Sequence, residues 1–278
     1  MTTDVNRTQS IRRIIATLTI LPLVALIGHS PSIQAAGLAD AIAHCENPNR
    51  ECKRFAAKDY VITKDNCGPT QALLVVSAHH DPAQGSGWVL GIEDPLAAAG
   101  PTNYWKEAWE QGAEIILPRL LHWTPARDEI GLAVNSPYDR SASILHIHID
   151  VVLPEVTAAL RAHANEATFD ITPPWNDPRM KPPTYRVTRV ESLNQNPFLA
   201  LWQRHGLKPE HHSVAPEAIA NTTLAVVGAP KGQFFVLEYQ GGQADGKNPA
   251  PGHSEDLQIA HAKCRYGDNQ WQVPEAFR

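Results

Sequence analysis

The stretch Ile144–Asp150 reads Ile-Leu-His-Ile-His-Ile-Asp, and from its second residue it alternates strictly between aliphatic and polar side chains. Alternate side chains of a β-strand point to opposite faces, so the pattern predicts a strand. The aliphatic set shares the face that we expect to contact the core: Leu145, Ile147 and Ile149. His146 and His148 share the other face, roughly 7 Å apart at a rise of about 3.3 Å per residue. This spacing lets two imidazoles converge on one small group, such as a phosphate or a metal ion.

The residues that precede this strand predict a hairpin. Residues 130–135 have the composition of a strand, and 135–140 (Asn-Ser-Pro-Tyr-Asp-Arg) have the composition of a turn. Three polar residues, Asn135, Arg140 and Ser141, are then expected near the strand ends, beside the imidazoles. The hairpin therefore predicts an oxyanion pocket, although histidines at half-exposed strand positions are also common in purely structural roles.

Length and composition indicate an ordinary globular protein. The chain has 278 residues, 43% of them apolar and 19% charged, which suits a single domain with a sizeable core. The net charge is −5, and no run of Lys and Arg exceeds two residues. Binding to a phosphate backbone needs a clustered basic face, so nucleic acid is not an expected partner.

The first 36 residues differ from the rest. Arg7, Arg12 and Arg13 precede an apolar run over residues 14–27, and small residues follow at 35–37. This order is typical of an export signal, and the run is shorter than the roughly 20 residues of a bilayer span. We therefore interpret residues 1–36 as a cleaved signal peptide or an uncleaved anchor, and residues 37–278 as the functional domain.

Four cysteines, an even number, suit an exported protein. Pairing Cys45 with Cys52 and Cys67 with Cys264 is the interpretation that we favour among three possible pairings. No Cys-x-x-Cys motif predicts zinc. His79-His80-Asp81 is interpreted as a polar loop rather than a metal cluster, because neighbouring strand residues point in opposite directions. No cofactor is predicted.

The remaining pattern predicts interleaved short strands and helices. Strands are expected at residues 60–63, 72–77, 88–92, 130–135, 144–150, 185–190, 224–228 and 233–239. Helices are expected at residues 38–45, 103–117, 154–164 and 197–206. Glycine motifs of dinucleotide or nucleoside triphosphate sites are absent, so the predicted fold class is α+β with an antiparallel sheet and flanking helices.

Several of these stretches resemble a known family. Asn135-Ser136, Arg140-Ser141 and Leu145–Ile149 are similar to the histidine-triad superfamily of hydrolases and transferases, and within it to the bacterial CDP-diacylglycerol pyrophosphatases. The resemblance extends over residues 38–266, including 60–74, 104–109 and 189–198. It implies a histidine-triad-like antiparallel sheet in a single domain.

The resemblance also implies an activity, namely hydrolysis of CDP-diacylglycerol to CMP and phosphatidate at a membrane surface, on the periplasmic side of the bacterial inner membrane. The middle histidine of the His-x-His-x-His motif corresponds to His146, which would attack phosphorus. His148 would contact the phosphoryl oxygens or the leaving group, and Asn135, Ser141 and Arg140 would bind substrate. A neutral imidazole, with a reference pKa of about 6.5, is a competent nucleophile without a metal.

One position departs from the motif, because Ile144 stands where the first histidine is expected. Three other interpretations therefore stay open. They are a broader nucleoside diphosphate hydrolase or nucleotidyltransferase, an exported nucleotide-binding protein without turnover, and a metal enzyme using His146, His148 and Asp150. The sequence does not predict an oligomeric state.

Overall fold

The structure, a computed structural model, describes residues 45, 52–55, 59–64, 71–76, 79–81, 85–87, 89–137, 140, 144–173, 183–211, 219, 221–240 and 254–259. All of them belong to one compact unit, Pro31–Arg278. The predicted signal or anchor, the helix at 38–44 and Ser141 lie outside the described residues. So do the side chains of Cys52, Cys67 and Cys264, and the disulfide pairing stays a prediction.

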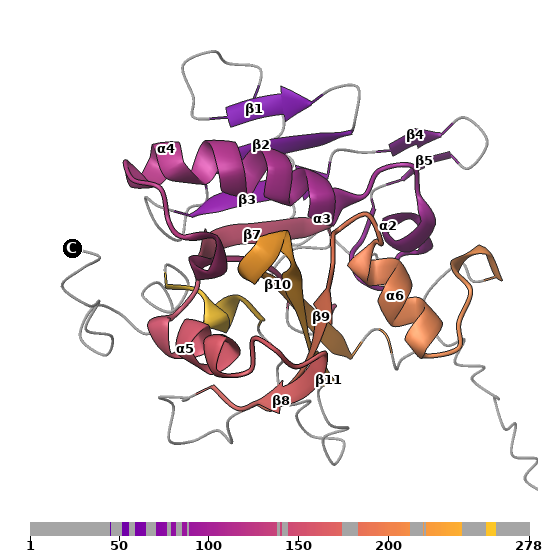
Figure 1. Cartoon of the computed structure of the whole chain (residues 1–278). Helices are drawn as coiled ribbons and strands as arrows, with labels where there is room; N and C mark the ends of the chain where they lie inside the picture. Colours follow the sequence, from indigo (N-terminus) through magenta and orange to yellow (C-terminus); the bar gives the residue numbers. More distant parts are fainter. Residues whose placement is uncertain are drawn as a thin grey trace, which may run out of the picture. The chain divides into compact units, whose positions relative to one another are not determined.

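The described residues form one large antiparallel sheet of nine strands (Figure 1). Its order is β1-β2-β3-β7-β6-β10-β11-β9-β8. The strands are β1 (Cys52–Phe55), β2 (Tyr60–Lys64), β3 (Ala72–Val76), β6 (Ile130–Val134), β7 (His146–Val151), β8 (Thr168–Ile171), β9 (Tyr185–Val190), β10 (Thr222–Gly228) and β11 (Phe234–Gln240). A separate hairpin pairs β4 (His79–Asp81) with β5 (Gly85–Gly87). The predicted antiparallel α+β class is confirmed.

The helices begin where the sequence places caps and prolines. They are α2 (Pro95–Ala99), α3 (Tyr104–Glu107), the π-helix η2 (Ala108–Ile116), α4 (Leu117–Leu121), α5 (Pro154–Ala162) and α6 (Pro197–Arg204). Short 3₁₀ turns are η3 (Arg127–Glu129), η4 (Pro209–His211), η5 (Pro230–Gly232) and η6 (Ser254–Leu257). The Asn103 side chain accepts the Lys106 N–H at 3.3 Å, and Asn196 accepts the Phe198 N–H at 3.0 Å. Asn103 and Asn196 are therefore the N-caps of α3 and α6.

One prediction of secondary structure was wrong, and two features of the helices and strands were not predicted. Residues 89–94 form a turn rather than a strand, because the Asp94 carboxylate accepts the Leu90 N–H at 2.8 Å and caps α2. The helix expected at 103–117 is present, but it consists of three contiguous parts, α3, the π-helix η2 and the start of α4. The strands β1, β4, β5 and β8 were not predicted, since each has only three or four residues, and β4 forms where a polar loop was expected at residues 79–81.

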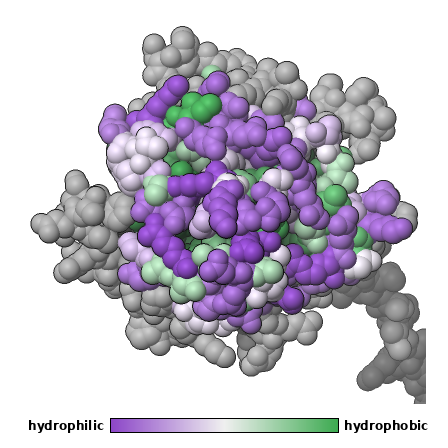
Figure 2. Space-filling view, in the orientation of Figure 1, coloured by the Kyte–Doolittle hydropathy of each residue, from purple (hydrophilic) through white to green (hydrophobic). Residues whose placement is uncertain are grey.

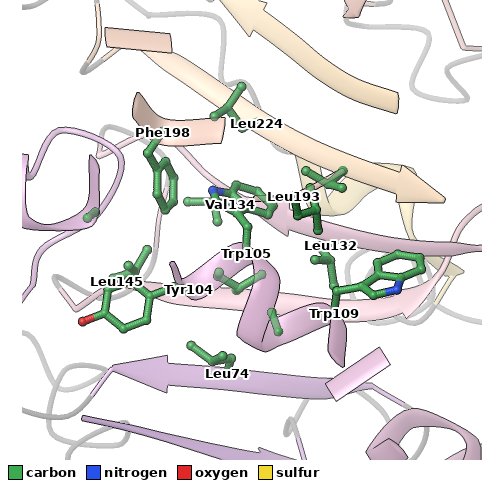
Figure 3. Packing of buried hydrophobic residues seen from close by; sticks show 14 of the residues in the cluster. Leu74, Tyr104, Trp105, Trp109, Leu132, Val134, Leu145, Leu193, Phe198 and Leu224 are labelled. Carbon is green, nitrogen blue, oxygen red and sulfur yellow. The ribbon is translucent and has the colours of Figure 1, made fainter. Parts of the chain in front are cut away.

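The aliphatic face of β7 packs on the helices, as the alternation predicts. Leu145, Ile147 and Ile149 join one buried cluster with Trp105 and Trp109, whose side chains come from the α3–η2 segment (Figure 3). Residues of α2 and α6 extend the same cluster, including Ala97, Ala98, Phe198, Leu201 and Trp202. This face of the sheet therefore carries the main core.

The opposite face of the sheet is covered in separate parts. A second buried cluster combines Val156 and Leu160 of α5 with residues of β8 to β11, including Phe169, Val187, Ala225 and Phe235. A third, smaller cluster contains Cys45, Val61, Leu73, Val75 and Ile144. The histidines of β7 belong to this face and to neither cluster. Two apolar regions therefore flank a polar strip.

Two buried tryptophans allow a matched test of the core. Trp202 Nε1 donates to the Ile92 carbonyl at 3.1 Å, whereas Trp105 Nε1 is buried without an acceptor among the described residues. We expect Trp202→Phe to lower the free energy of unfolding by about 1–2 kcal/mol more than Trp105→Phe, because only the former leaves a buried carbonyl unsatisfied. Urea denaturation of both variants measures this difference, and equal losses would contradict it.

The described surface is mostly polar. The face in Figure 2 shows predominantly hydrophilic side chains, with small separate hydrophobic areas. Among the described residues, the large hydrophobic side chains that are exposed are Leu90 and Trp123, each 39% accessible. Within the same part of the chain, no helix has both the length and the apolar character required to cross a bilayer.

Candidate active site

Strand β7 brings His146 and His148 together in the polar strip. Their ring centroids are 5.1 Å apart, with planes inclined at 73°, in an edge-to-face arrangement. The residues are 6% and 8% exposed, so bulk water has little access to either ring. The predicted convergence of the two imidazoles is therefore present, and their catalytic roles stay a prediction.

A backbone hydrogen bond fixes the protonation of His146. Its Nδ1 lies 2.7 Å from the carbonyl oxygen of Ile144. A carbonyl can only accept, so Nδ1 carries the proton and the neutral ring keeps its lone pair on Nε2. The neutral His146 ring is thus held in the tautomer whose Nε2 is unprotonated.

The strands beside β7 differ in the bulk that they place around the imidazoles. On one side, β3 pairs Val75 with His146 and Leu73 with His148. On the other side, β6 pairs Ala133 with His148 and Gly131 with Asp150. The smaller residues lie on the β6 side, where the side chain of Val152 fills the space at Gly131, since a Cβ there would lie 2.4 Å from Val152 Cγ1.

Asn135 directly follows β6, as predicted, and is 4% exposed. The residue beside it, Ser254, belongs to the last described segment of the chain. The Ser254 hydroxyl donates to the Val134 carbonyl at 2.9 Å and lies 3.5 Å from Asn135 Oδ1. Thr223 also donates to the Val134 carbonyl, at 2.7 Å. The segment that begins at Ser254 therefore supports the strand end that carries Asn135.

Sequence reasoning missed a second contribution from this segment. Gln258 Nε2 donates to the carbonyls of Gly131 at 2.8 Å and His148 at 3.2 Å. Its Oε1 accepts from Gln71 Nε2 at 3.2 Å, and both glutamines are buried. A glutamine pair separated by this much sequence gives no local signal, so only the fold reveals it.

Arg140 is held away from solvent by a partner that the sequence did not suggest. Its guanidinium makes a bidentate ion pair with Glu93, with donor–acceptor distances of 2.9 and 2.5 Å. The two side chains are 11% and 8% exposed. The Arg140 N–H also donates to the Ser136 carbonyl at 3.0 Å. The Asp94-Pro95 pair marks a helix start, and it was the available signal for the turn that carries Glu93.

Ile144 lies just before β7, two residues ahead of His146, and it joins apolar neighbours. It is 4% exposed and packs in the cluster with Val61, Leu73 and Val75. Aliphatic contacts therefore surround the position where the motif has its first histidine.

The metal interpretation gains no support from this geometry. Across the residues that the structure describes, including His146, His148 and Asp150, no three His, Cys, Asp or Glu side chains are arranged to hold an ion. The side chains of His79–Asp81, although their backbone forms β4, lie outside the description.

Comparisons with known proteins agree on one family. The family model described as CDP-diacylglycerol pyrophosphatase matches residues 39–267. A Yersinia pestis protein named CDP-diacylglycerol pyrophosphatase is 31% identical over 181 residues, which are 64% of this chain and 63% of that protein. The similarity thus spans less than two thirds of that relative. Because the family model covers most of the sequence, the chain belongs to the CDP-diacylglycerol pyrophosphatase family.

Proposed function

We propose that this protein is an enzyme that hydrolyses CDP-diacylglycerol to CMP and phosphatidate through a nucleotidyl-histidine intermediate. Family membership supports the substrate and the hydrolysis. The observation that carries the mechanism is the 2.7 Å hydrogen bond from His146 Nδ1 to the Ile144 carbonyl, with His148 beside it. A histidine that acts as a nucleophile attacks through an unprotonated nitrogen, and the bond from Nδ1 supports Nε2 in that role by holding the proton on the other nitrogen.

The proposed reaction has two displacements at the same phosphorus. In the first, His146 Nε2 attacks the phosphorus of the cytidylyl half, an N–P bond forms, and the bond to the bridging oxygen breaks. Phosphatidate leaves with that oxygen. In the second, water attacks the same phosphorus and loses a proton to the solvent, the N–P bond breaks, and CMP leaves as His146 regains its lone pair. Each displacement is easier than direct attack by water on the diphosphate.

The neighbouring residues have proposed roles in positioning and charge stabilisation. His148, whose ring centroid is 5.1 Å from that of His146, would donate to a phosphoryl oxygen or to the leaving oxygen. Asn135 and Ser141 would bind non-bridging oxygens, because phosphoryl transfer depends on orientation and electrostatic stabilisation.

The cellular setting is part of the proposal. A substrate with two acyl chains resides in a bilayer, so the enzyme would act at a membrane surface. The apolar run at residues 14–27 supports export, to the periplasmic side of the bacterial inner membrane. A histidine-triad-like ancestry of the sheet is likewise proposed, on the motif around His146 and His148.

The test is to trap the intermediate. The purified full chain is mixed with CDP-diacylglycerol labelled in the cytidylyl phosphate, in detergent with a chelator present, and quenched on the millisecond scale. We expect protein-bound label that is stable to base and labile to acid, as a phosphoramidate is. We also expect CMP release to persist in the chelator, because the imidazole needs no metal to attack.

Each alternative predicts a different result. Absence of CMP release would contradict the proposed function, and nucleotide binding without turnover would then favour the binding protein. Release of CMP without bound label at any quench time would contradict the covalent mechanism. Equal rates on several nucleoside diphosphate esters would favour the broader hydrolase.

A further inference from the structure

The turn at residues 89–94 is rigidly built, although it lies outside the histidine strand. The Asp94 carboxylate accepts the N–H groups of Leu90 and Leu96, each at 2.8 Å. The Asp94 N–H donates in turn to the Gly91 carbonyl at 3.0 Å. Burial raises the pKa of Asp94, while these two N–H donors stabilise its charged form. The Asp94 side chain therefore fixes the conformation of the turn that contains Gly91.

This turn contacts the chain at two points just before β7. At the first, Glu93 holds the guanidinium of Arg140 with two hydrogen bonds of 2.9 and 2.5 Å. At the second, the Val89 carbonyl accepts the Leu145 N–H at 2.7 Å. A bidentate carboxylate–guanidinium pair fixes both distance and orientation. The 89–94 turn therefore holds the chain at both Arg140 and Leu145.

The second contact reaches the nucleophile through a single peptide group. The N–H of Leu145 and the C=O of Ile144 belong to the same planar unit. Val89 holds the N–H end at 2.7 Å, and His146 Nδ1 donates to the C=O end, also at 2.7 Å. A peptide held at its N–H cannot turn its carbonyl away, and donation at one end strengthens acceptance at the other.

We propose that Glu93 is a positioning residue for His146. Its ion pair with Arg140 holds the 89–94 turn against the entry to β7, and the turn orients the Ile144–Leu145 peptide that fixes the tautomer of His146. Arg140 then serves this support rather than the substrate. A phosphate contact would draw the guanidinium from a carboxylate that is 8% exposed, leaving a buried charge without its partner.

Two variants test the support in different ways. Glu93→Gln removes the charge from the ion pair with little change in shape. Gly91→Ala removes no charge, but its Cβ would lie 2.1 Å from Arg140 Nη1 and 2.8 Å from Glu93 Oε2, so the pair must move. The matched control is Asp128→Asn, because Asp128 makes a bidentate pair with Arg161, at 2.6 and 2.9 Å, in an exposed position on other elements.

We expect both variants to lower kcat about tenfold with KM changed less than about twofold, since the nucleophile loses its orientation while binding groups remain. Asp128→Asn should keep both constants. Nitrogen-15 spectra of histidine-labelled protein provide a second readout. The wild type should show His146 with the proton on Nδ1, and both variants should show a mixture of tautomers.

Contrary results are equally specific. Unchanged kcat in both variants, with His146 still protonated on Nδ1, would overturn the inference. So would a rise in KM alone, which would return Arg140 to substrate binding. If Glu93→Gln does not fold, as judged by near-ultraviolet circular dichroism, Gly91→Ala decides. The kinetic part of this test rests on the proposed function, but the tautomer spectra do not. A wild-type protein without turnover would therefore overturn the proposed function, and the spectra alone would then decide the role of Glu93.

Discussion

Replacing His146 with alanine should abolish CMP release from CDP-diacylglycerol, with kcat reduced by at least about 10³-fold. The side chain supplies the attacking nitrogen, and the ring is held ready by its 2.7 Å bond to the Ile144 carbonyl. Steady-state rates in mixed micelles measure the effect.

A surface histidine provides the control for that experiment. His163 lies at the end of α5, is 39% exposed at its side chain, stacks on Phe169 and contacts Glu166. We expect His163→Ala to keep kcat within about twofold, as surface substitutions generally do. Activity of His146→Ala comparable with that of this control would refute the assignment of the nucleophile.

The largest expected effect on stability is that of Trp105→Ala. Trp105 is fully buried and packs on Phe198 with ring centroids 5.1 Å apart, between the sheet and α6. Truncation of a buried tryptophan costs about 3–5 kcal/mol, a large share of the roughly 5–15 kcal/mol that stabilises a domain. Denaturant unfolding followed by circular dichroism measures the loss.

A partly exposed tryptophan serves as the control for the loss of packing in this test. Trp123→Ala removes the same atoms from a residue that is 39% exposed, and should change stability by less than about 1 kcal/mol. Because Trp105 lies on the helix side of the sheet, Trp105→Ala should keep kcat near the wild-type value below its unfolding transition. A similar loss of stability in both variants would contradict the assigned core.

The sequence was most informative where local patterns decide structure. The alternation around His146 and His148 predicted the strand, its apolar face and the convergence of the imidazoles. The Asn196-Pro197 start of α6 and the strand β9 were predicted at their observed positions. In these cases, the residues that determine the structure are within a few positions of one another, so the local sequence pattern predicts the element.

Prediction failed where the deciding partner is distant or where two local signals compete. The segment 88–92 has the composition of a strand, but the carboxylate of Asp94 competes for its backbone N–H groups and forms a turn. The partners of Arg140 and His148 could not be read from the sequence, since Glu93 and Gln258 lie 47 and 110 residues away. Long-range partners of this kind leave no periodic signal.

The order of the strands has a consequence for how activity arises during folding. Strand β7 pairs on one side with β3, where Ala72 faces Ile149, and β6 on its other side pairs with β10, where Val134 faces Leu224. Such a topology has a high contact order, because long loops close before their contacts form, and chains of this kind fold slowly. A nascent chain therefore contains both histidines long before Ser254 can reach the end of β6. Catalytic competence is acquired late and as a whole, when the last pairings of the chain are complete.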